Sequence, residues 1–516
     1  MDKIVVLDFG SQTAQLISRR IRDLGVFSEI LPGNTLAALL AADGDIRGIV
    51  LSGSPASVHD DDAPEPDNSL YDLSLPKLGI CYGLQRAVHD SGGVVGRSTS
   101  REYGRSRLHF SFDHPLFAGV PDGFVSWMSH GDHVEQLPAG AAVVARSEHD
   151  VPAAIMLSDS FTGIQFHPEV THCEHGDEIL RNFAVRIAGA QTAWSMENYV
   201  EKASATIRSR VDRAPVLLLI SGGVDSTVVA ALLLHALPPE QVYLMYVDTG
   251  LMRKDETEEV SRTLDALGAE HVDIVDASDD FLGALSGVSD PEEKRAIIGD
   301  LFMTVQEREI ARRVPGNYFL AQGTLYTDMI ESGGGVGKHA HVIKSHHNVR
   351  SPLVAAKREA GQLVEPLSML YKDEVRRLGE VLGVNPEVVR RHPFPGPGLA
   401  VRILSDVTRE KCEVLREADH IYITELKRRG LYDEIWQAFA VLLPTRSVGV
   451  AGDSRKYGYV VALRAVTSAD GMTADVYPFP PQDLLEISAM ITNRVDAVGR
   501  VVYDVSSKPP ATIEWE

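Results

Sequence analysis

One stretch near the middle of the chain constrains the fold more than any other. Its residues are Ser221, Gly222, Gly223, Val224, Asp225, Ser226 and Thr227. The apolar run 215–220 before it is typical of a buried parallel strand, and the apolar run 228–237 after it predicts a helix packed on that strand. A strand, a Gly-Gly turn and a helix N-terminus together form an anion site, because the first N–H groups of the helix are unpaired. The segment therefore predicts a phosphate-binding loop in an α/β domain.

No Gly-Lys-Ser/Thr closes this segment, so it is not a Walker A loop. It resembles the SGGxDS loop of the PP-loop ATP pyrophosphatases, which cleave ATP between the α- and β-phosphates and adenylylate a substrate. The resemblance implies that residues 221–227 bind ATP. The alternative is an ordinary glycine-rich turn between a strand and a helix.

Asp225 is an acid in a loop that is expected to bind pyrophosphate. A carboxylate makes physical sense there if Mg²⁺ lies between it and the phosphates, because Mg²⁺ takes oxygen ligands and few carboxylates. We therefore expect Mg²⁺ with ATP, held by Asp225. The alternative is that Asp225 caps the following helix.

Composition limits the class of protein. At 516 residues the chain is long enough for about three domains, if each has about 150 residues. Acidic residues outnumber basic ones by 72 to 50, which gives a net charge of −22 and argues against nucleic acid as a partner. No apolar run approaches the ~20 residues of a membrane span, and the start of the sequence has no signal-peptide pattern. The sequence has three cysteines and no CxxC pair, which argues against a disulfide framework or a zinc site. Together these features predict a cytoplasmic protein with no membrane or nucleic-acid partner.

The first segment, residues 1–192, is predicted to form one α/β domain. The apolar runs 4–8 and 46–51 each end in a Gly/Ser-rich turn, as parallel strands do. The run 77–80 leads into Cys81, which lies between Gly79 and Gly83 where a strand turns into a helix. A helix N-terminus lowers the pKa of a thiol, and glycines permit a strained nucleophile elbow. A lone cysteine is more often a small buried hydrophobic residue, and we expect this of Cys173 and Cys412.

A second motif supports catalysis at Cys81. The strand 161–166 ends in His167-Pro168-Glu169, so a histidine can take the thiol proton and a glutamate can orient it. A structural histidine is the alternative. The set resembles class I glutamine amidotransferases, which implies that Cys81 forms a glutamyl thioester, with His167 as base and Glu169 as its orienter.

In that family the oxyanion donors are backbone N–H groups, which fall here on Ser54 and Tyr82. The family more often has Gly-Gly-Pro where this chain has Gly53-Ser54-Pro55. Because the donor is main chain, we expect Ser54 to be tolerated.

The middle segment, residues 193–390, contains the phosphate-binding loop. Helices are predicted at 194–211, 256–267 and 291–313, and further strands at 241–247, 271–275 and 317–321. In a doubly wound sheet, ligands lie at the carboxyl ends of strands. The residues expected there, in addition to the loop, are Asp248, Gln322, Gly323 and Thr324.

A cationic cluster follows at 344–349, Lys-Ser-His-His-Asn-Val, in an otherwise acidic chain. A solvated loop is the alternative to a ligand contact. The ordered set of motifs, from the triad through 221–227 and this cluster to the tail Lys508-Pro509-Pro510 and 513–516, resembles the glutamine-hydrolysing GMP synthase family over the whole chain. The resemblance implies that Lys344, His346 and His347 belong to a lid over ATP and XMP. The chain departs from the family in two places: Arg350-Ser351 replaces Gly-Gly after the lid, and Thr249 replaces Asn.

The last segment, residues 391–516, begins with a Pro/Gly-rich stretch at 393–398. Helices are predicted at 409–429 and 431–440 and strands at 447–450, 457–466 and 500–505, a small α+β domain. The resemblance implies that this domain forms a homodimer and completes the XMP site, with Arg402, Lys508 and Glu514 as nucleotide contacts. The region 472–482 departs from the family pattern, which affects details of the subunit contact.

These expectations combine into one architecture and one reaction. The fold class is α/β, with two doubly wound, mainly parallel-sheet domains (1–192 and 193–390) and a small C-terminal α+β domain (391–516). The resemblance implies that ATP adenylylates XMP and that ammonia from glutamine displaces AMP to give GMP.

Two other functions remain open at this point. One is a PP-loop enzyme that modifies tRNA, against which the acidic charge and the lack of paired catalytic cysteines count. The other is a glutamine-sensing module without catalysis, against which the intact triad and loop count.

Overall fold

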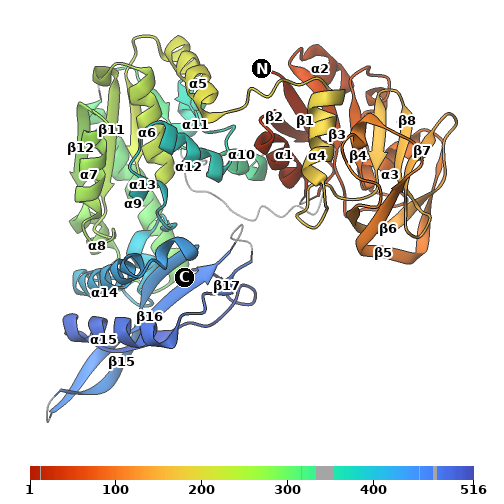
Figure 1. Ribbon diagram of the computed structural model, residues 1–516. Coiled ribbons are helices and arrows are strands. Elements are labelled where there is room, and N and C mark those ends of the chain that lie inside the picture. Colours follow the sequence, from red (N-terminus) through yellow and green to blue (C-terminus); the bar gives the residue numbers. More distant parts are fainter. Residues whose placement is uncertain (12, 315, 333–351, 452–453, 469–472) are drawn as a thin grey trace. The chain divides into compact units, whose positions relative to one another are not determined.

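The computed structural model describes residues 1–516 apart from 12, 315, 333–351, 452–453 and 469–472 (Figure 1). The chain divides into two compact units. One contains Met1–Tyr199 and residues 330–332, and the other contains Val200–Met329 and the described residues from 352 onward. Among the described residues, no helix is both long and apolar enough to cross a bilayer.

Within the described residues, the first unit has a nine-stranded sheet with the order β2-β1-β3-β4-β9-β8-β7-β5-β6. The strands at one end pair in parallel: β1 (Lys3–Asp8), β2 (Phe27–Pro32), β3 (Ile46–Leu51), β4 (Lys77–Ile80) and β9 (Phe161–Ile164). The strands at the other end pair antiparallel: β5 (Val94–Phe110), β6 (Val125–Gln136), β7 (Ala142–Ser147) and β8 (Pro152–Ser158). The runs 4–8, 46–51 and 77–80 are strands, as predicted, whereas nothing in our sequence reading indicated the antiparallel part.

Helices and apolar side chains cover both faces of this sheet. The helical elements of the first unit are α1 (Thr13–Asp23), α2 (Ala37–Ala42), α3 (Tyr82–Asp90), α4 (Gly176–Arg181), η1 (Asn68–Leu70), η2 (Pro115–Phe117) and η3 (Asn182–Ile187). Alternate residues of β1 belong to different cores. Ile4 and Val6 pack with α1, while Val5 and Leu7 pack with α3. This is the doubly wound arrangement that the sequence predicted for a strand buried on both faces.

The second unit begins with a parallel sheet of five strands within the described residues, in the order β12-β11-β10-β13-β14. Its strands are β10 (Val216–Ile220), β11 (Val242–Asp248), β12 (His271–Asp276), β13 (Phe319–Ala321) and β14 (Leu363–Val364). Its helical elements are α5 (Met196–Val211), α6 (Val224–Ala236), η4 (Pro239–Gln241), α7 (Glu256–Ala266), α8 (Ser278–Ala284), α9 (Pro291–Arg313), α10 (Tyr326–Ser332), α11 (Pro352–Glu359), α12 (Lys372–Val381) and α13 (Pro386–Val389). The predicted strands and helices of 193–321 are present, so this part is α/β as expected.

The C-terminal part, drawn in blue in Figure 1, is an α+β arrangement. Its elements are η5 (Gly398–Arg402), α14 (Arg409–Arg428), η6 (Tyr432–Glu434), β15 (Gln437–Ala451), β16 (Ser454–Thr467), β17 (Asp475–Val476), α15 (Pro481–Arg494) and β18 (Val498–Tyr503). Strand β15 pairs antiparallel with β16, and β18 pairs parallel with β16. The region 472–482 contributes β17, the start of α15 and two nearly buried aromatic rings, Tyr477 and Phe479.

One prediction in this part was wrong. Residues 431–440 do not form a helix, because Gln437 onward belongs to β15 and its register runs from Gln437 opposite Val466 to Leu442 opposite Val461. The segment 431–440 mixes apolar residues with Asp433, Glu434 and Gln437, so its pattern alone does not separate a helix from a strand. Backbone pairing with β16 makes the residues from Gln437 onward a strand.

The predicted boundary between residues 390 and 391 is not visible as a separation of compact units. A single hydrophobic core joins side chains of the parallel sheet, such as Leu217 and Leu320, to Leu415 of α14 and Ile487 of α15. The three-domain division therefore stays a prediction.

Candidate active sites

Cys81 lies at a sharp turn between β4 and α3. Its backbone has φ 51° and ψ −104°, a left-handed conformation that is strained for a non-glycine residue. Two glycines permit the turn. A Cβ added at Gly79 would lie 2.8 Å from the carbonyl carbon of Gly83, and one added at Gly83 would lie 2.4 Å from the backbone oxygen of Leu51. The turn therefore presents the thiol at the end of a parallel strand, in the manner of a nucleophile elbow.

His167 and Glu169 follow β9, the strand next to β4 in the sheet. The Nδ1 atom of His167 lies 2.7 Å from Oε1 of Glu169, whose side chain is completely buried. Burial alone would lower the pKa of His167, but hydrogen bonds with Cys81 and Glu169 outweigh it and raise the pKa to about 10. The imidazole of His167 is therefore protonated at neutral pH, and a cation lies beside the Cys81 thiol.

This charge pairing predicts an unusual pH profile for the reactivity of Cys81. Because the pKa of His167 is raised, the imidazolium persists below about pH 10, and the alkylation rate of Cys81 with iodoacetamide is expected to vary little between about pH 6 and 9. In Glu169→Gln the pKa of His167 falls, so alkylation at about pH 7 is expected to slow about tenfold and to rise with pH. Mass spectrometry of the alkylated peptides measures these rates.

Two cysteines serve as internal controls in that measurement. Burial raises the pKa of Cys173 to about 12 and that of Cys412 to about 11, so both thiols are expected to react slowly at every pH tested. A rate at Cys81 that rises through the ordinary thiol pKa of about 8.5 would contradict the ion pair.

A cavity of about 780 Å³ opens beside the thiol. It is lined by Cys81, His167, Ser54, Gln85, Tyr103 and Trp127, among others. Tyr82 is the first residue of α3, where backbone N–H groups lack helical acceptors, and its hydroxyl donates to the Pro64 carbonyl oxygen at 2.6 Å. The two predicted oxyanion residues thus lie on the cavity wall (Ser54) and beside Cys81 in the chain (Tyr82).

Two glutamines near the thiol were missed by our sequence reading. Gln165 Nε2 lies 3.6 Å from the Cys81 sulfur, and Gln85 Nε2 donates to Gln165 Oε1 at 3.3 Å and to the Asp132 carbonyl oxygen at 2.8 Å. A signal was available, since Gln165 lies two residues before His167 on the same side of the chain, and Gln85 lies one helical turn after Cys81.

The phosphate-binding loop leads from β10 into α6. Gly222 has φ 76°, and α6 begins at Val224, four residues earlier than predicted. The early start is stabilised by Ser226 Oγ and Thr227 Oγ1, which donate to the Gly223 carbonyl oxygen at 3.1 and 3.0 Å. Because Gly223 is the N-cap residue, the backbone N–H groups of the first turn lie at residues 224–226, where an anion would bind.

Asp225 does not cap α6. Both of its carboxylate oxygens lie 2.6 Å from Nζ of Lys372, the first residue of α12, which our sequence reading did not select. The Asp225 side chain is 30% exposed, so a ligand can reach it. Among the described residues there is no group of three or more potential metal ligands. An accessible carboxylate beside a phosphate site is a ligand of the kind that Mg²⁺ takes when it is bound with ATP.

The other predicted ATP contacts follow the neighbouring strands. Asp248 ends β11, and its two oxygens accept from the Gly250 N–H at 2.8 Å and from Thr257 Oγ1 at 2.7 Å. A Cβ added at Gly323 would lie 3.3 Å from Cβ of Asp225, so the segment Gln322, Gly323 and Thr324 after β13 lies beside the phosphate-binding loop. Thr249, which stands where the family more often has Asn, accepts through its Oγ1 from the Leu251 N–H at 3.3 Å. Lys344, His346, His347 and Arg350-Ser351 lie outside the described residues.

Two of the three predicted XMP contacts meet in the C-terminal part. Arg402 is completely buried, and its Nε and Nη2 donate to Glu514 at 3.1 and 2.8 Å. Gln437 Nε2, which we did not predict, also donates to Glu514 at 2.7 Å. Lys508 exchanges backbone hydrogen bonds with Ala474 at 2.8 and 3.0 Å.

A buried lysine anchors the end of the chain. Lys294 Nζ donates to Glu516 Oε2 at 2.6 Å and to the carbonyl oxygens of Ala400 and Ile403 at 3.2 and 2.7 Å. The segment that carries Arg402 and the tail that carries Glu514 are thus tied to the same lysine on α9.

Three models of known protein families match successive parts of the chain. Family models match "Glutamine amidotransferase class-I" over residues 5–187, "Asparagine synthase" over residues 202–301 and "GMP synthase C terminal domain" over residues 424–515. The fold and the two sites define a class of enzyme, a class I glutamine amidotransferase joined to a PP-loop ATP-using domain.

Full-length relatives identify the family within that class. The GMP synthase [glutamine-hydrolyzing] of Aquifex aeolicus is 50% identical over 99% of this chain and 99% of its own length. The proteins of the same name from Geobacillus kaustophilus and Symbiobacterium thermophilum are each 50% identical over 100% of this chain and 99% of their own lengths. The chain belongs to the glutamine-hydrolysing GMP synthase family.

Proposed function

We propose that this enzyme aminates XMP to GMP, using ATP for activation and glutamine as the nitrogen source (EC 6.3.5.2). The overall reaction consumes XMP, ATP, glutamine and water and releases GMP, AMP, pyrophosphate and glutamate. The observation that carries the proposal is the presence, on one chain, of a Cys81-His167-Glu169 set and a 221–227 phosphate loop, each with the geometry described above.

The first half-reaction makes ammonia. The Cys81 thiolate attacks the carboxamide carbon of glutamine, and the backbone N–H groups of Ser54 and Tyr82 stabilise the oxyanion. His167 gives its proton to the departing ammonia and then takes one from the water that hydrolyses the glutamyl thioester. Glu169 holds the imidazole in position through the 2.7 Å contact at Nδ1.

The second half-reaction activates XMP. The C2 oxygen of XMP is a poor leaving group until it attacks the α-phosphate of ATP and becomes adenylylated, with release of pyrophosphate. The N–H groups and hydroxyls of 221–227 bind the phosphates. Asp225 would hold Mg²⁺, which neutralises phosphate charge when bound. Ammonia then adds at C2 and AMP leaves.

The other predicted contacts orient the two nucleotides. Asp248, Gln322, Gly323 and Thr324 follow the carboxyl ends of β11 and β13, where a nucleotide binds in this fold. Arg402, Lys508 and Glu514 are proposed to bind XMP, and the buried Arg402–Glu514 pair supports a preorganised site. Lys344, His346 and His347 are proposed as the lid.

The proposed function has a direct test. Purified protein is supplied with ATP, XMP and Mg²⁺ and either glutamine or ammonium, and GMP, AMP and pyrophosphate are measured in equal amounts. A matched reaction without XMP is expected to release no pyrophosphate. Glutamine hydrolysis without XMP-dependent AMP formation would contradict the proposal.

We also propose a homodimer formed through residues 391–516. The β15–β16 pair exposes three large apolar side chains, Val448 (50%), Val450 (82%) and Tyr457 (63%), and exposed apolar patches mark interaction sites. Sedimentation velocity is expected to give a dimer, and Val450→Asp with Tyr457→Asp is expected to shift it toward monomer. A fully active parent that sediments only as a monomer would refute this assembly.

A cytoplasmic location is our proposal as well. The three cysteines are all free and buried, which fits a reducing compartment. The substrates ATP, XMP and glutamine fit the same compartment.

A further inference from the structure

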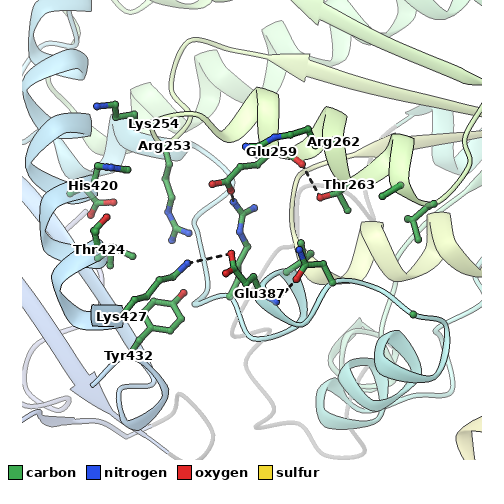
Figure 2. A pocket seen from close by; sticks show the side chains of 18 residues that line it. Arg253, Lys254, Glu259, Arg262, Thr263, Glu387, His420, Thr424, Lys427 and Tyr432 are labelled. Carbon is green, nitrogen blue, oxygen red and sulfur yellow. Dashed lines mark hydrogen bonds and ion pairs between the residues drawn. The ribbon is translucent and has the colours of Figure 1, made fainter. Parts of the chain in front are cut away.

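A second cavity, of about 380 Å³, lies within the second unit (Figure 2). It is bordered by α7, by the segment from the end of α12 through α13 to Arg391, and by α14. None of residues 221–227 lines it. Its size falls in the range of about 300–1,000 Å³ that is usual for small-molecule sites.

One end of this cavity is rich in cations. In Figure 2 the Arg253 and Lys427 side chains point into the same space from opposite walls. The nearest carboxylate to Lys427 is Glu387, at 4.0 Å. Two other cations of the wall are paired, since Lys254 lies 2.8 Å from Glu417 and Arg391 pairs with Glu256 and Glu259. The basic residues that line the cavity, Arg253, Lys254, Arg262, Arg391 and Lys427, outnumber its carboxylates, Glu259, Glu387 and Asp419. The cation excess stands out in a chain of net charge −22.

Arg253 is the most informative of these groups. Its guanidinium lies 4.5 Å from the centre of the Phe394 ring, and its Nη2 lies 3.4 Å from the Pro393 carbonyl oxygen, a long contact. The buried Nε has no hydrogen-bond partner among the described residues. The charges of Glu256 and Asp419 act on the guanidinium, but neither carboxylate compensates for its burial. Burial lowers the pKa of Arg253. An arginine held in this way is stabilised if an anion binds beside it.

The rest of the cavity is less polar. Ala266 and Leu267 at the end of α7, Val388 of α13 and Ile423 of α14 line it. A ligand that fits has an anionic group for the Arg253 end and a small uncharged body for the remainder.

We propose that this cavity binds a small organic phosphate through Arg253 and Lys427, outside the 221–227 loop. The site adjoins the proposed XMP contacts, because the Phe394 ring lies 4.5 Å from the Arg253 guanidinium and 5.0 Å from that of Arg402. A dianionic phosphate suits an arginine and a lysine together better than a carboxylate does, because it carries more charge and more acceptor oxygens.

One residue of the cavity wall also contacts the phosphate-binding loop. Arg391 lines the cavity, and its Nη1 donates to the Gly222 carbonyl oxygen at 3.1 Å. A bound phosphate attracts Arg391 away from Gly222 and Glu256. The ligand is therefore expected to raise the KM for ATP about threefold or more, while glutamine hydrolysis is unchanged.

Crystals of the full chain soaked in sodium tungstate, a heavy tetrahedral dianion, test the site directly. An anomalous peak is expected about 4 Å from the Arg253 and Lys427 nitrogens, because the tungstate oxygens lie between those nitrogens and the tungsten atom. A second peak at residues 221–227 serves as the positive control. A filled loop with an empty cavity would overturn the proposal.

Variants separate a built site from chance binding of an ion. Lys427→Gln and Arg253→Gln are each expected to weaken binding of ribose 5-phosphate at least about tenfold in calorimetry. Arg428→Gln is the matched control, because Arg428 lies next to Lys427 but does not line the cavity. Lys427 is 48% exposed, so its replacement is expected to leave folding intact. Equal binding in all three variants means an adventitious ion only.

A kinetic comparison tests the coupling, which rests on the proposed function. Ribose 5-phosphate is expected to raise the KM for ATP in the parent and in Arg428→Gln but not in Lys427→Gln. Binding without any change in KM would refute the coupling and leave the site standing. Failure of all nucleotide chemistry would count against the proposed function instead, since the crystal and calorimetric results do not depend on it.

Discussion

Cys81→Ala is expected to reduce glutamine-dependent GMP formation about 10⁴-fold or more, while ammonium-dependent formation keeps its rate within about twofold. The nucleophile serves only the first half-reaction, and external ammonia bypasses it. The cysteine lies in a cavity with His167 and Ser54 in the first unit, whereas residues 221–227 lie in the second unit. The measurement is GMP formation with each nitrogen source at saturating ATP and XMP.

Cys173→Ala provides the matched control for this experiment. Cys173 is also buried in the first unit, but burial raises its pKa to about 12, and it lies outside the cavity. Its replacement is expected to leave both activities within about twofold of the parent, because Cys173 has no part in the chemistry. If Cys81→Ala lost both activities equally, the assignment of Cys81 to ammonia production would be wrong.

Asp225→Asn is expected to lower XMP-dependent pyrophosphate release by about 10²–10³-fold with either nitrogen source, and to raise the magnesium requirement. The physical reason is the loss of the one carboxylate that the described part of the phosphate site offers to Mg²⁺. Folding and glutamine hydrolysis are expected to be normal. The measurement is pyrophosphate release across a magnesium titration.

The contact with Lys372 supplies the rival explanation and the control. The ion pair is partly exposed, since 30% of the Asp225 side chain and 45% of the Lys372 side chain are accessible to solvent. If Asp225 serves only as the partner of Lys372, the pair contributes at most about 1 kcal/mol to the free energy of unfolding. In that case Lys372→Met and Asp225→Asn would have similar small effects, and neither would change the magnesium dependence. A magnesium curve of Asp225→Asn that overlays that of the parent would refute the metal role.

Local sequence determined the parts of the fold that short-range physics controls. Apolar runs followed by glycine turns predicted β1, β3, β4 and β10 to within a residue or two at each end. The residue order around Cys81 predicted a strained turn, and the structure has φ 51° there. These features depend on hydrophobic periodicity and on the steric freedom of glycine, which residues a few positions apart decide.

Tertiary structure decided what depends on distant partners. The run 431–440 has an ambiguous apolar pattern, and only pairing with β16 makes it a strand. Gln165 contacts Cys81 although the two are 84 residues apart in the sequence, and Lys372 contacts Asp225 although they are 147 residues apart. Lys294 reached Glu516 across 222 residues, and the cations around Arg253 come together from α14 and from the segments that flank α7 and α13. Neither periodicity nor propensity predicts such pairs. A charged or hydroxyl side chain needs a partner, but the packing of the whole fold determines which distant residue lies beside it.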